Sequence, residues 1–234
     1  MRFTPSTRIL VIAAHPDDEV LGMGATLAKA HSKESIVSVV FLGEGVSARF
    51  PFGQYDSKEF SHQSEVRIKG ACAALKILGI EETHFYNRLC GQFDKYPLIS
   101  IVKDIESHID RFRPDILFTH NPAEVNVDHR ISYQAVEVAC RPARAQTPSE
   151  IYTFEIVCSG SWTFDTTFKP NVYVDVTKYW GQKMEAWKQY VGENRPFPFP
   201  RSDKGLETLA HYRGMASGLQ KAEAFRLIRE IQEP

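Results

Sequence analysis

Cysteine is scarce in this sequence of 234 residues: the four cysteines are Cys72, Cys90, Cys140 and Cys158, and no pair forms a Cys-x-x-Cys motif. Their spacing indicates neither a zinc knuckle nor a disulfide framework. No apolar run approaches the roughly 18–20 residues of a membrane span. The apolar run from Ile9 to Ala14 is too short for a signal peptide. We therefore expect a cytoplasmic protein without a membrane span.

An excess of charge of one sign is also lacking, since 28 Lys and Arg face 29 Asp and Glu, for a formal net charge of -1. This balance argues against nucleic acid or anionic membrane as the partner. Hydrophobic residues make up 43% and charged residues 24% of the chain, as in average soluble globular proteins. Because no repeat, low-complexity tract or long linker is present, we expect a single domain over residues 1–234.

Apolar runs alternate with amphipathic segments in the first half of the chain. The pattern predicts strands at 8–14, 36–41, 83–86 and 115–119, and helices at 19–31, 58–78 and 98–112. Gly79 is expected to cap the second helix and Pro114 to stop the third. Strands that alternate with helices favour right-handed βαβ crossovers. The prediction is an α/β fold, a Rossmann-like sandwich with a mostly parallel sheet flanked by helices.

The second half of the sequence is more mixed. Strands are predicted at 151–157 and 171–176, and an irregular loop at 195–201. Between them, Thr177 is expected to cap a helix that turns Trp180, Met184, Trp187 and Val191 inward. Ser202 is expected to begin a final long helix.

Two polar clusters follow predicted strands, at the carboxyl ends where ligands bind in such folds. His15-Pro-Asp-Asp-Glu19 follows the first strand, and the run from His120 to His129 follows the fourth. Imidazole and carboxylate ligands suit Zn²⁺ or another first-row divalent metal, and His129 would supply the third ligand of a catalytic site. The structural alternative is that Asp18 caps the first helix; Asp128 is well placed to cap the helix that begins near His129.

The first cluster also carries a family resemblance. His15-Pro-Asp-Asp-Glu19, preceded by Ala-Ala and followed by Gly22-x-Gly24, resembles the signature of the PIG-L/LmbE-like deacetylases. These zinc-dependent enzymes remove acetyl groups from N-acetylglucosamine-type sugars. Further matches are Asp128-His129-Arg130, Tyr212-Arg-Gly214 and Ala222-Glu-Ala-Phe225. The resemblance spans roughly residues 8–228, and its most specific part is 13–19.

The resemblance implies roles for four residues: His15, Asp18 and His129 would bind zinc, and Asp17 would be the general base. A zinc ion with three protein ligands lowers the pKa of bound water from 15.7 to about 7. Asp17 would accept the water's proton and later pass it to the leaving amine. This is the chemistry of metal-assisted amide hydrolysis.

The chain departs from the family pattern around the pocket. Asn126 stands where many relatives have a histidine that is thought to stabilise the oxyanion, and the loss of one such donor costs on the order of 10²–10³ in rate. An amide can donate a hydrogen bond there, and His120 is a second candidate for that role. Glu124 stands where relatives in this branch usually carry Asp, and an acidic residue of the pocket is displaced, with Cys90 and Asp94 nearby. These changes bear on the identity of the substrate and not on the hydrolysis itself.

Five residues are candidates for contact with substrate: Glu44, Arg49, Arg67, Glu124 and Trp162. Glu44 lies in a glycine-rich loop over 43–49, whose glycines permit close approach of a ligand or simply form a flexible turn. Arg49 and Arg67 suit a phosphate or diphosphate, or are solvated. Trp162 suits stacking on a sugar face, or core packing.

The leading hypothesis is a Zn²⁺-dependent N-deacetylase of an N-acetylated amino sugar that is free, nucleotide-linked or lipid-linked. One alternative is an amidase for a sugar–thiol conjugate. Another is a non-catalytic, metal-dependent carbohydrate-binding protein, since Asn126 departs from the usual histidine. Relatives often form trimers or hexamers, so the resemblance also makes a homo-oligomer one of the expectations.

Overall fold

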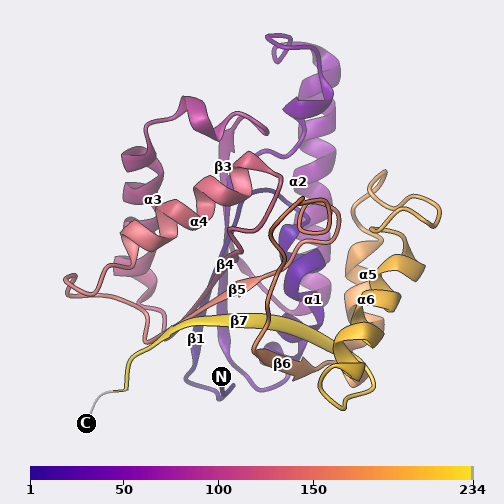
Figure 1. Ribbon diagram of the computed structural model, residues 1–234. Helices are drawn as coiled ribbons and strands as arrows, with labels where there is room; N and C mark the ends of the chain where they lie inside the picture. The colour runs from indigo at the N-terminus through magenta and orange to yellow at the C-terminus, as the bar shows by residue number, and fades with distance from the viewer. Residues whose placement is uncertain (233–234) are drawn as a thin grey trace.

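The computed structural model describes residues 1–232, which form a seven-stranded sheet with helices on both faces (Figure 1). The strands are β1 (Arg8–Ala13), β2 (Ile36–Gly43), β3 (Glu82–Arg88), β4 (Ile116–His120), β5 (Glu150–Phe154), β6 (Val172–Asp175) and β7 (Ala222–Glu230). The α-helices are α1 (Asp18–His31), α2 (Lys58–Leu78), α3 (Leu98–Phe112), α4 (Val127–Ala139), α5 (Trp180–Trp187) and α6 (Asp203–Met215).

The sheet has the strand order β3-β2-β1-β4-β5-β7-β6. The first five strands of this order are parallel, and β7 runs antiparallel to both β5 and β6. Helices α3 and α4 cover one face, and α1, α2, α5 and α6 cover the other (Figure 1). The predicted Rossmann-like, mostly parallel sheet is confirmed.

Strand β1 lies inside the sheet, between β2 and β4, and is buried on both faces. Ile9, Val11 and Ala13 pack with α1, α2, α5 and α6, whereas Leu10 and Ile12 pack with α3 and α4. Alternate side chains of a strand point to opposite faces, so the run without polar residues is what a strand between two helical layers requires.

The predicted elements of the first half are confirmed to within two residues at their ends. Helix α2 begins and ends as its sequence predicts. Ser57 caps its first turn, where the hydroxyl accepts a hydrogen bond of 3.1 Å from the amide of Phe60. Gly79 ends the helix in the left-handed region with φ of 79°, where a side chain would be strained.

The second half departs from three predictions. The helix after Ser202 ends at Met215, and Ala222–Glu230 forms β7, a strand that the sequence analysis did not predict. Thr177 is not the cap of α5, because it lies in a 3-10 turn and its hydroxyl donates to Asp175. Val191 lies beyond the end of α5 and is 77% exposed, so the prediction that it turns inward was wrong. Among residues 1–232, no helix has the length and apolar character needed to cross a membrane.

Candidate metal centre and active site

The two polar clusters lie together at the carboxyl ends of β1 and β4. These strands are parallel neighbours, with Ile9 opposite Ile116 and Val11 opposite Phe118. The chain order of the parallel strands reverses between them. Such a switch point opens a crevice at the strand ends, and both the loop after Ala13 and the loop after His120 lead into it.

His15, Asp18 and His129 converge, as the sequence predicts for a metal site. One ligand atom from each lies within 4.8 Å of the other two, and all three residues are buried. The Nδ1 of His15 is 3.6 Å from Asp18 Oδ2, and the Nε2 of His129 is 3.4 Å from Asp18 Oδ1. The proposed ligands therefore come from two strand ends more than a hundred residues apart.

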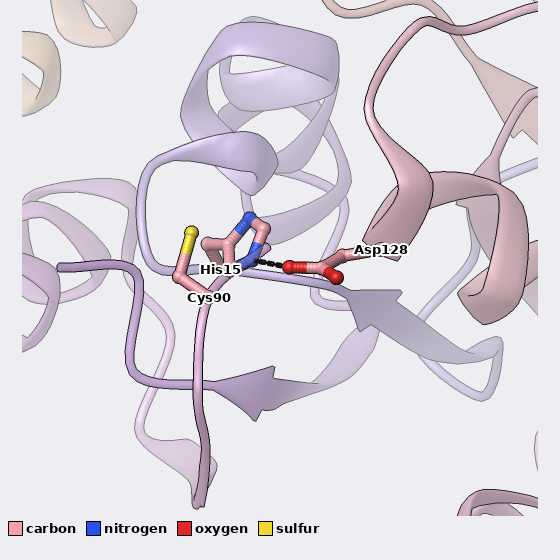
Figure 2. Close-up of side chains that lie close together, drawn as sticks. All are labelled: His15, Cys90 and Asp128. Carbon is pink, nitrogen blue, oxygen red and sulfur yellow. Dashed lines mark hydrogen bonds and ion pairs between the residues drawn. The ribbon is translucent and has the colours of Figure 1, made fainter. Parts of the chain in front are cut away.

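The other ring nitrogen of each histidine is held by a carboxylate. His15 Nε2 lies 2.8 Å from Asp128 Oδ2 (Figure 2), and His129 Nδ1 lies 3.0 Å from Glu124 Oε2. A carboxylate accepts a hydrogen bond from the ring N–H, so in a neutral ring the opposite nitrogen carries the lone pair. In that form His15 Nδ1 and His129 Nε2 are free to bind a metal, and these are the nitrogens next to Asp18. Outer carboxylates of this kind orient histidine ligands in metal sites.

Asp18 carries the clearest sign that a cation fits here. Its Oδ1 is buried and has no hydrogen-bond partner among the described residues, while Oδ2 accepts from the amide of His15 at 2.8 Å. Burial raises the pKa of the Asp18 carboxyl, but His129, His120 and His15 outweigh burial and hold the pKa far below its usual value. A carboxylate with one unpartnered oxygen, close to a nitrogen of each of two imidazoles, is a donor set that suits Zn²⁺.

Two further groups of candidate ligands among residues 1–232 overlap this one: His120 with Glu124 and His129, and His15 with Cys90 and Asp128. His120 is fully buried, and its Nε2 accepts a hydrogen bond of 2.8 Å from the amide of Ala14. Its ring stacks on His129 at 4.0 Å between centroids, and burial lowers its pKa. His120 therefore packs against both Asp18 and His129. Its role as a donor to the oxyanion stays a prediction.

Asp17, next to Asp18 in the chain, lies against two arginines. Its backbone has φ of 125°, a conformation that side chains rarely adopt and that costs on the order of 1–3 kcal/mol. Its Oδ2 contacts Arg67 Nη2 at 3.2 Å and Arg201 Nη1 at 3.0 Å. Burial raises the pKa of Asp17, and the two guanidinium groups offset this rise only in part. The two neighbouring carboxylates thus have different partners, arginines for Asp17 and histidines for Asp18.

Glu193 holds the two arginines that contact Asp17. Arg67 Nη1 lies 2.9 Å from Glu193 Oε1, Arg201 Nη1 lies 3.6 Å from Glu193 Oε2, and Arg49 also pairs with Glu193. Neither Glu193 nor Arg201 was predicted from the sequence. Arg201 is the last residue of the proline-rich loop over 195–201, which was predicted to be irregular. No local pattern indicates that such a loop brings an arginine to Asp17.

Asn126, rather than Asp128, caps helix α4. The side-chain oxygen of Asn126 accepts a hydrogen bond of 2.9 Å from the amide of Asp128. The prediction that Asp128 is the cap was wrong because α4 begins at Val127, which places Asp128 in the first turn. Its carboxylate instead accepts from His15 and from the amides of Gly91 and Phe93. The capping bond leaves the NH₂ group of half-buried Asn126 as its remaining donor.

Glu44 and Glu124 were expected to contact substrate, but protein donors occupy both. The carboxylate of Glu44 accepts from the amides of Val46, Ser47 and Cys90 and from the hydroxyl of Ser47. The carboxylate of Glu124 accepts from His129, Ser159 and the amide of Ile156. Both side chains are buried. Gly45, with φ of 79°, packs closely on His15 and Pro16, so this loop approaches the metal-binding turn itself.

Arg49 and Arg67 border a cleft of about 330 Å³ whose lining also includes His62, Tyr190 and Glu193. Arg67 is buried, so the alternative of a solvated side chain was wrong; Arg49 is 45% exposed. Trp162 is 55% exposed, which excludes the alternative of core packing. Contact of Arg49, Arg67 or Trp162 with a substrate stays a prediction.

Comparison with known proteins agrees with this arrangement. The family described as PIG-L, GlcNAc-PI de-N-acetylase, matches residues 10–140, which is more than half of the chain. The chain is 26% identical to the diacetylchitobiose deacetylase of Thermococcus kodakarensis, over 98% of this chain and 86% of that protein.

Solved structures show the same fold. The N,N'-diacetylchitobiose deacetylase of Pyrococcus horikoshii aligns with a TM-score of 0.74 at 23% identity, over 95% of this chain and 84% of that one. GalB, the 4-carboxy-2-hydroxymuconate hydratase of Pseudomonas putida, aligns with a TM-score of 0.75 at 19% identity, over 97% and 99%. Because one fold carries both activities, the fold does not decide the reaction. The sequence match does identify the relationship: the chain belongs to the PIG-L family of de-N-acetylases.

Proposed function

We propose that this chain is a zinc-dependent N-deacetylase that hydrolyses the acetamide of an N-acetylated amino sugar of the N-acetylglucosamine type. The observation that carries the proposal is the buried set of His15, Asp18 and His129. Asp18 Oδ1 has no hydrogen-bond partner among the described residues, His129 Nε2 lies 3.4 Å from that oxygen, and His15 Nδ1 lies 3.6 Å from Oδ2. Asp17 precedes Asp18 in the chain. Both of its arginine contacts are made through Oδ2. Ligands and base are thus present together.

His15 Nδ1, Asp18 and His129 Nε2 would hold the metal. A zinc ion at such a site supplies a Lewis acid for the amide carbonyl and lowers the pKa of water. The same residues would also bind another first-row divalent metal. His120 keeps Asp18 and His129 in place through its packing against them.

Asp17 would transfer the protons. Arg67 and Arg201 both contact its Oδ2, which leaves Oδ1 to take a proton from the attacking water. The same oxygen then returns the proton to the amine as the C–N bond breaks, so that one carboxylate acts as base and then as acid. Burial raises the pKa of Asp17, which makes its carboxylate a stronger acceptor for the proton of the water.

The NH₂ group of Asn126 would donate a hydrogen bond to the oxyanion that develops on the acetyl carbonyl. The capping bond to Asp128 fixes its orientation, as preorganised donors require. The rest of the substrate would extend into the cleft that Arg49 and His62 border, with Trp162 as a candidate for sugar stacking. The buried Arg67 pairs with both Asp17 and Glu193. Arg49 pairs with Glu193 and is 45% exposed, so Arg49 is the better candidate to donate hydrogen bonds to a phosphate-linked carrier.

The test is acetate release from a panel of free, nucleotide-linked, lipid-linked and thiol-conjugated N-acetyl sugars, with metal-free enzyme and with one equivalent of zinc. Turnover should require metal and fall by about 10²–10⁴-fold in Asp17→Asn, the range of a lost general base. Asp94→Asn, which changes an exposed carboxylate, is the matched control. Sugar binding without hydrolysis across the panel would instead support the carbohydrate-binding alternative.

A further inference from the structure

A second group of metal-binding side chains adjoins the candidate metal centre. Cys90 Sγ, a ring nitrogen of His15 and a carboxylate oxygen of Asp128 all lie within 4.8 Å of one another. Figure 2 shows His15 between the thiol and the carboxylate. The proposed deacetylation uses His15 through its other edge and does not use Cys90 at all.

The backbone around Cys90 is fixed on both sides. Its amide donates to Glu44 Oε1 at 2.9 Å, and its carbonyl accepts from the hydroxyl of Ser47 at 3.2 Å. The next amide, that of Gly91, donates to Asp128 Oδ2. The backbone of Cys90 is therefore held next to Asp128, while the thiol can still rotate, and Cys90 remains partly exposed.

The spacing of these atoms suits one cation. Ligand atoms at about 2.0–2.3 Å from a tetrahedral zinc ion lie roughly 3.3–3.8 Å from one another. His15 Nε2 and Asp128 Oδ2 are 2.8 Å apart as a hydrogen-bonded pair and would separate slightly to share a cation. The sulfur lies within 4.8 Å of a ring nitrogen of His15 and a carboxylate oxygen of Asp128, so small side-chain movements would bring the three ligands to this spacing. A thiolate selects zinc and softer ions such as cadmium over hard oxygen-seeking cations.

We propose that Cys90, His15 Nε2 and Asp128 form an inhibitory site for a second thiophilic divalent metal ion. On binding, the Cys90 thiol releases its proton to solvent. His15 gives up its hydrogen bond to Asp128, and its ring proton moves from Nε2 to Nδ1. Since Nδ1 is the nitrogen that faces Asp18, His15 can no longer serve in the set with Asp18 and His129. Metal at the second site thus disables the first.

The test is a cadmium titration of the full chain that already holds one equivalent of zinc. A thiolate-to-cadmium ultraviolet absorption band should rise as deacetylase activity falls, and Cys90 should become protected from alkylation, as followed by mass spectrometry. Cys90→Ala and Cys90→Ser should lack the band. Their inhibition should need more than about 100-fold more cadmium, since loss of a direct ligand exceeds the 10–100-fold effect of an outer partner.

Cys72→Ser is the matched control, because Cys72 is an exposed thiol on α2, and this variant should behave like the parent. Equal cadmium inhibition of the parent and Cys90→Ala, or the absence of both the band and the protection in the parent, would overturn the proposal. The absorption and alkylation measurements need no substrate. They therefore still decide the question if the proposed deacetylase activity is not found.

Discussion

Glu124→Gln separates two roles for a residue that the sequence analysis assigned to the substrate. In the structure Glu124 Oε2 accepts from His129 Nδ1 at 3.0 Å and from the hydroxyl of Ser159, while Oε1 accepts from the amide of Ile156 at 3.3 Å. Glutamine has a single acceptor oxygen. If that oxygen faces His129, the NH₂ group opposes the amide of Ile156. If it faces Ile156, the NH₂ group donates to His129 Nδ1 and favours the tautomer that cannot bind metal through Nε2.

Either orientation weakens the metal site, so Glu124→Gln should lower zinc affinity by about 10–100-fold, the range for outer-shell partners. This loss corresponds to about 1.4–2.7 kcal/mol. Competition with a chromophoric chelator measures the affinity, and kinetics at saturating zinc should give an unchanged KM for the sugar.

Glu155→Gln is the matched control, because it removes a carboxylate next to Ile156 that pairs with Arg213 and does not contact His129. Parental zinc affinity in Glu124→Gln together with a raised KM would refute the role in positioning His129 and restore the contact with substrate.

Three further predictions address the surroundings of the site and the stability of the fold. Glu193→Gln should lower kcat by about 10–150-fold with little change in KM. This is the equivalent of about 1.5–3 kcal/mol of lost charge-assisted hydrogen bonding to the arginines that hold Asp17, and a change confined to KM would contradict it. Burial and the neighbouring His84 and Arg111 lower the pKa of His108 to about 4. Between pH 6.5 and pH 4 the unfolded chain therefore binds a proton at this histidine that the folded chain does not. The free energy of unfolding falls over this range by at most about 1.4 kcal/mol per pH unit. His108→Gln should flatten this fall in denaturant midpoints measured from pH 7 to pH 4.5, and an unaltered slope would count against it. Gly22→Ala should lower the free energy of unfolding by about 1–3 kcal/mol, because its Cβ would lie 2.6 Å from the Phe154 ring; an unchanged urea midpoint would show that the ring moves aside freely.

The sequence predicts the parallel part of the fold well because local patterns determine it. Strand β1 is an uninterrupted apolar run, and Ser57 and Gly79 mark the two ends of α2. Strand β7 was missed because its stability depends on partners far along the chain. It pairs with β5 and β6. Only its first four residues, 222–225, are all buried, so its sequence shows neither a continuous apolar run nor a clear alternation.

The same distinction applies to the candidate site, where local patterns predict some residues and others depend on contacts between distant parts of the chain. The polar clusters at two strand ends predicted a metal site, and the family resemblance assigned His15, Asp18 and His129 as its ligands. The roles of Glu124 and Asp128 could not be assigned, since an acidic residue in a loop gives no sign of which histidine its carboxylate will contact. Arg201 and Glu193 reach Asp17 only through the tertiary path of the chain after α5.

The most direct test of this account is an anomalous difference map from crystals grown with one equivalent of zinc. The account predicts one strong peak at about 2.0–2.2 Å from His15 Nδ1, an oxygen of Asp18 and His129 Nε2. A peak bound to other residues, or bound through His15 Nε2 at a single equivalent, would contradict it.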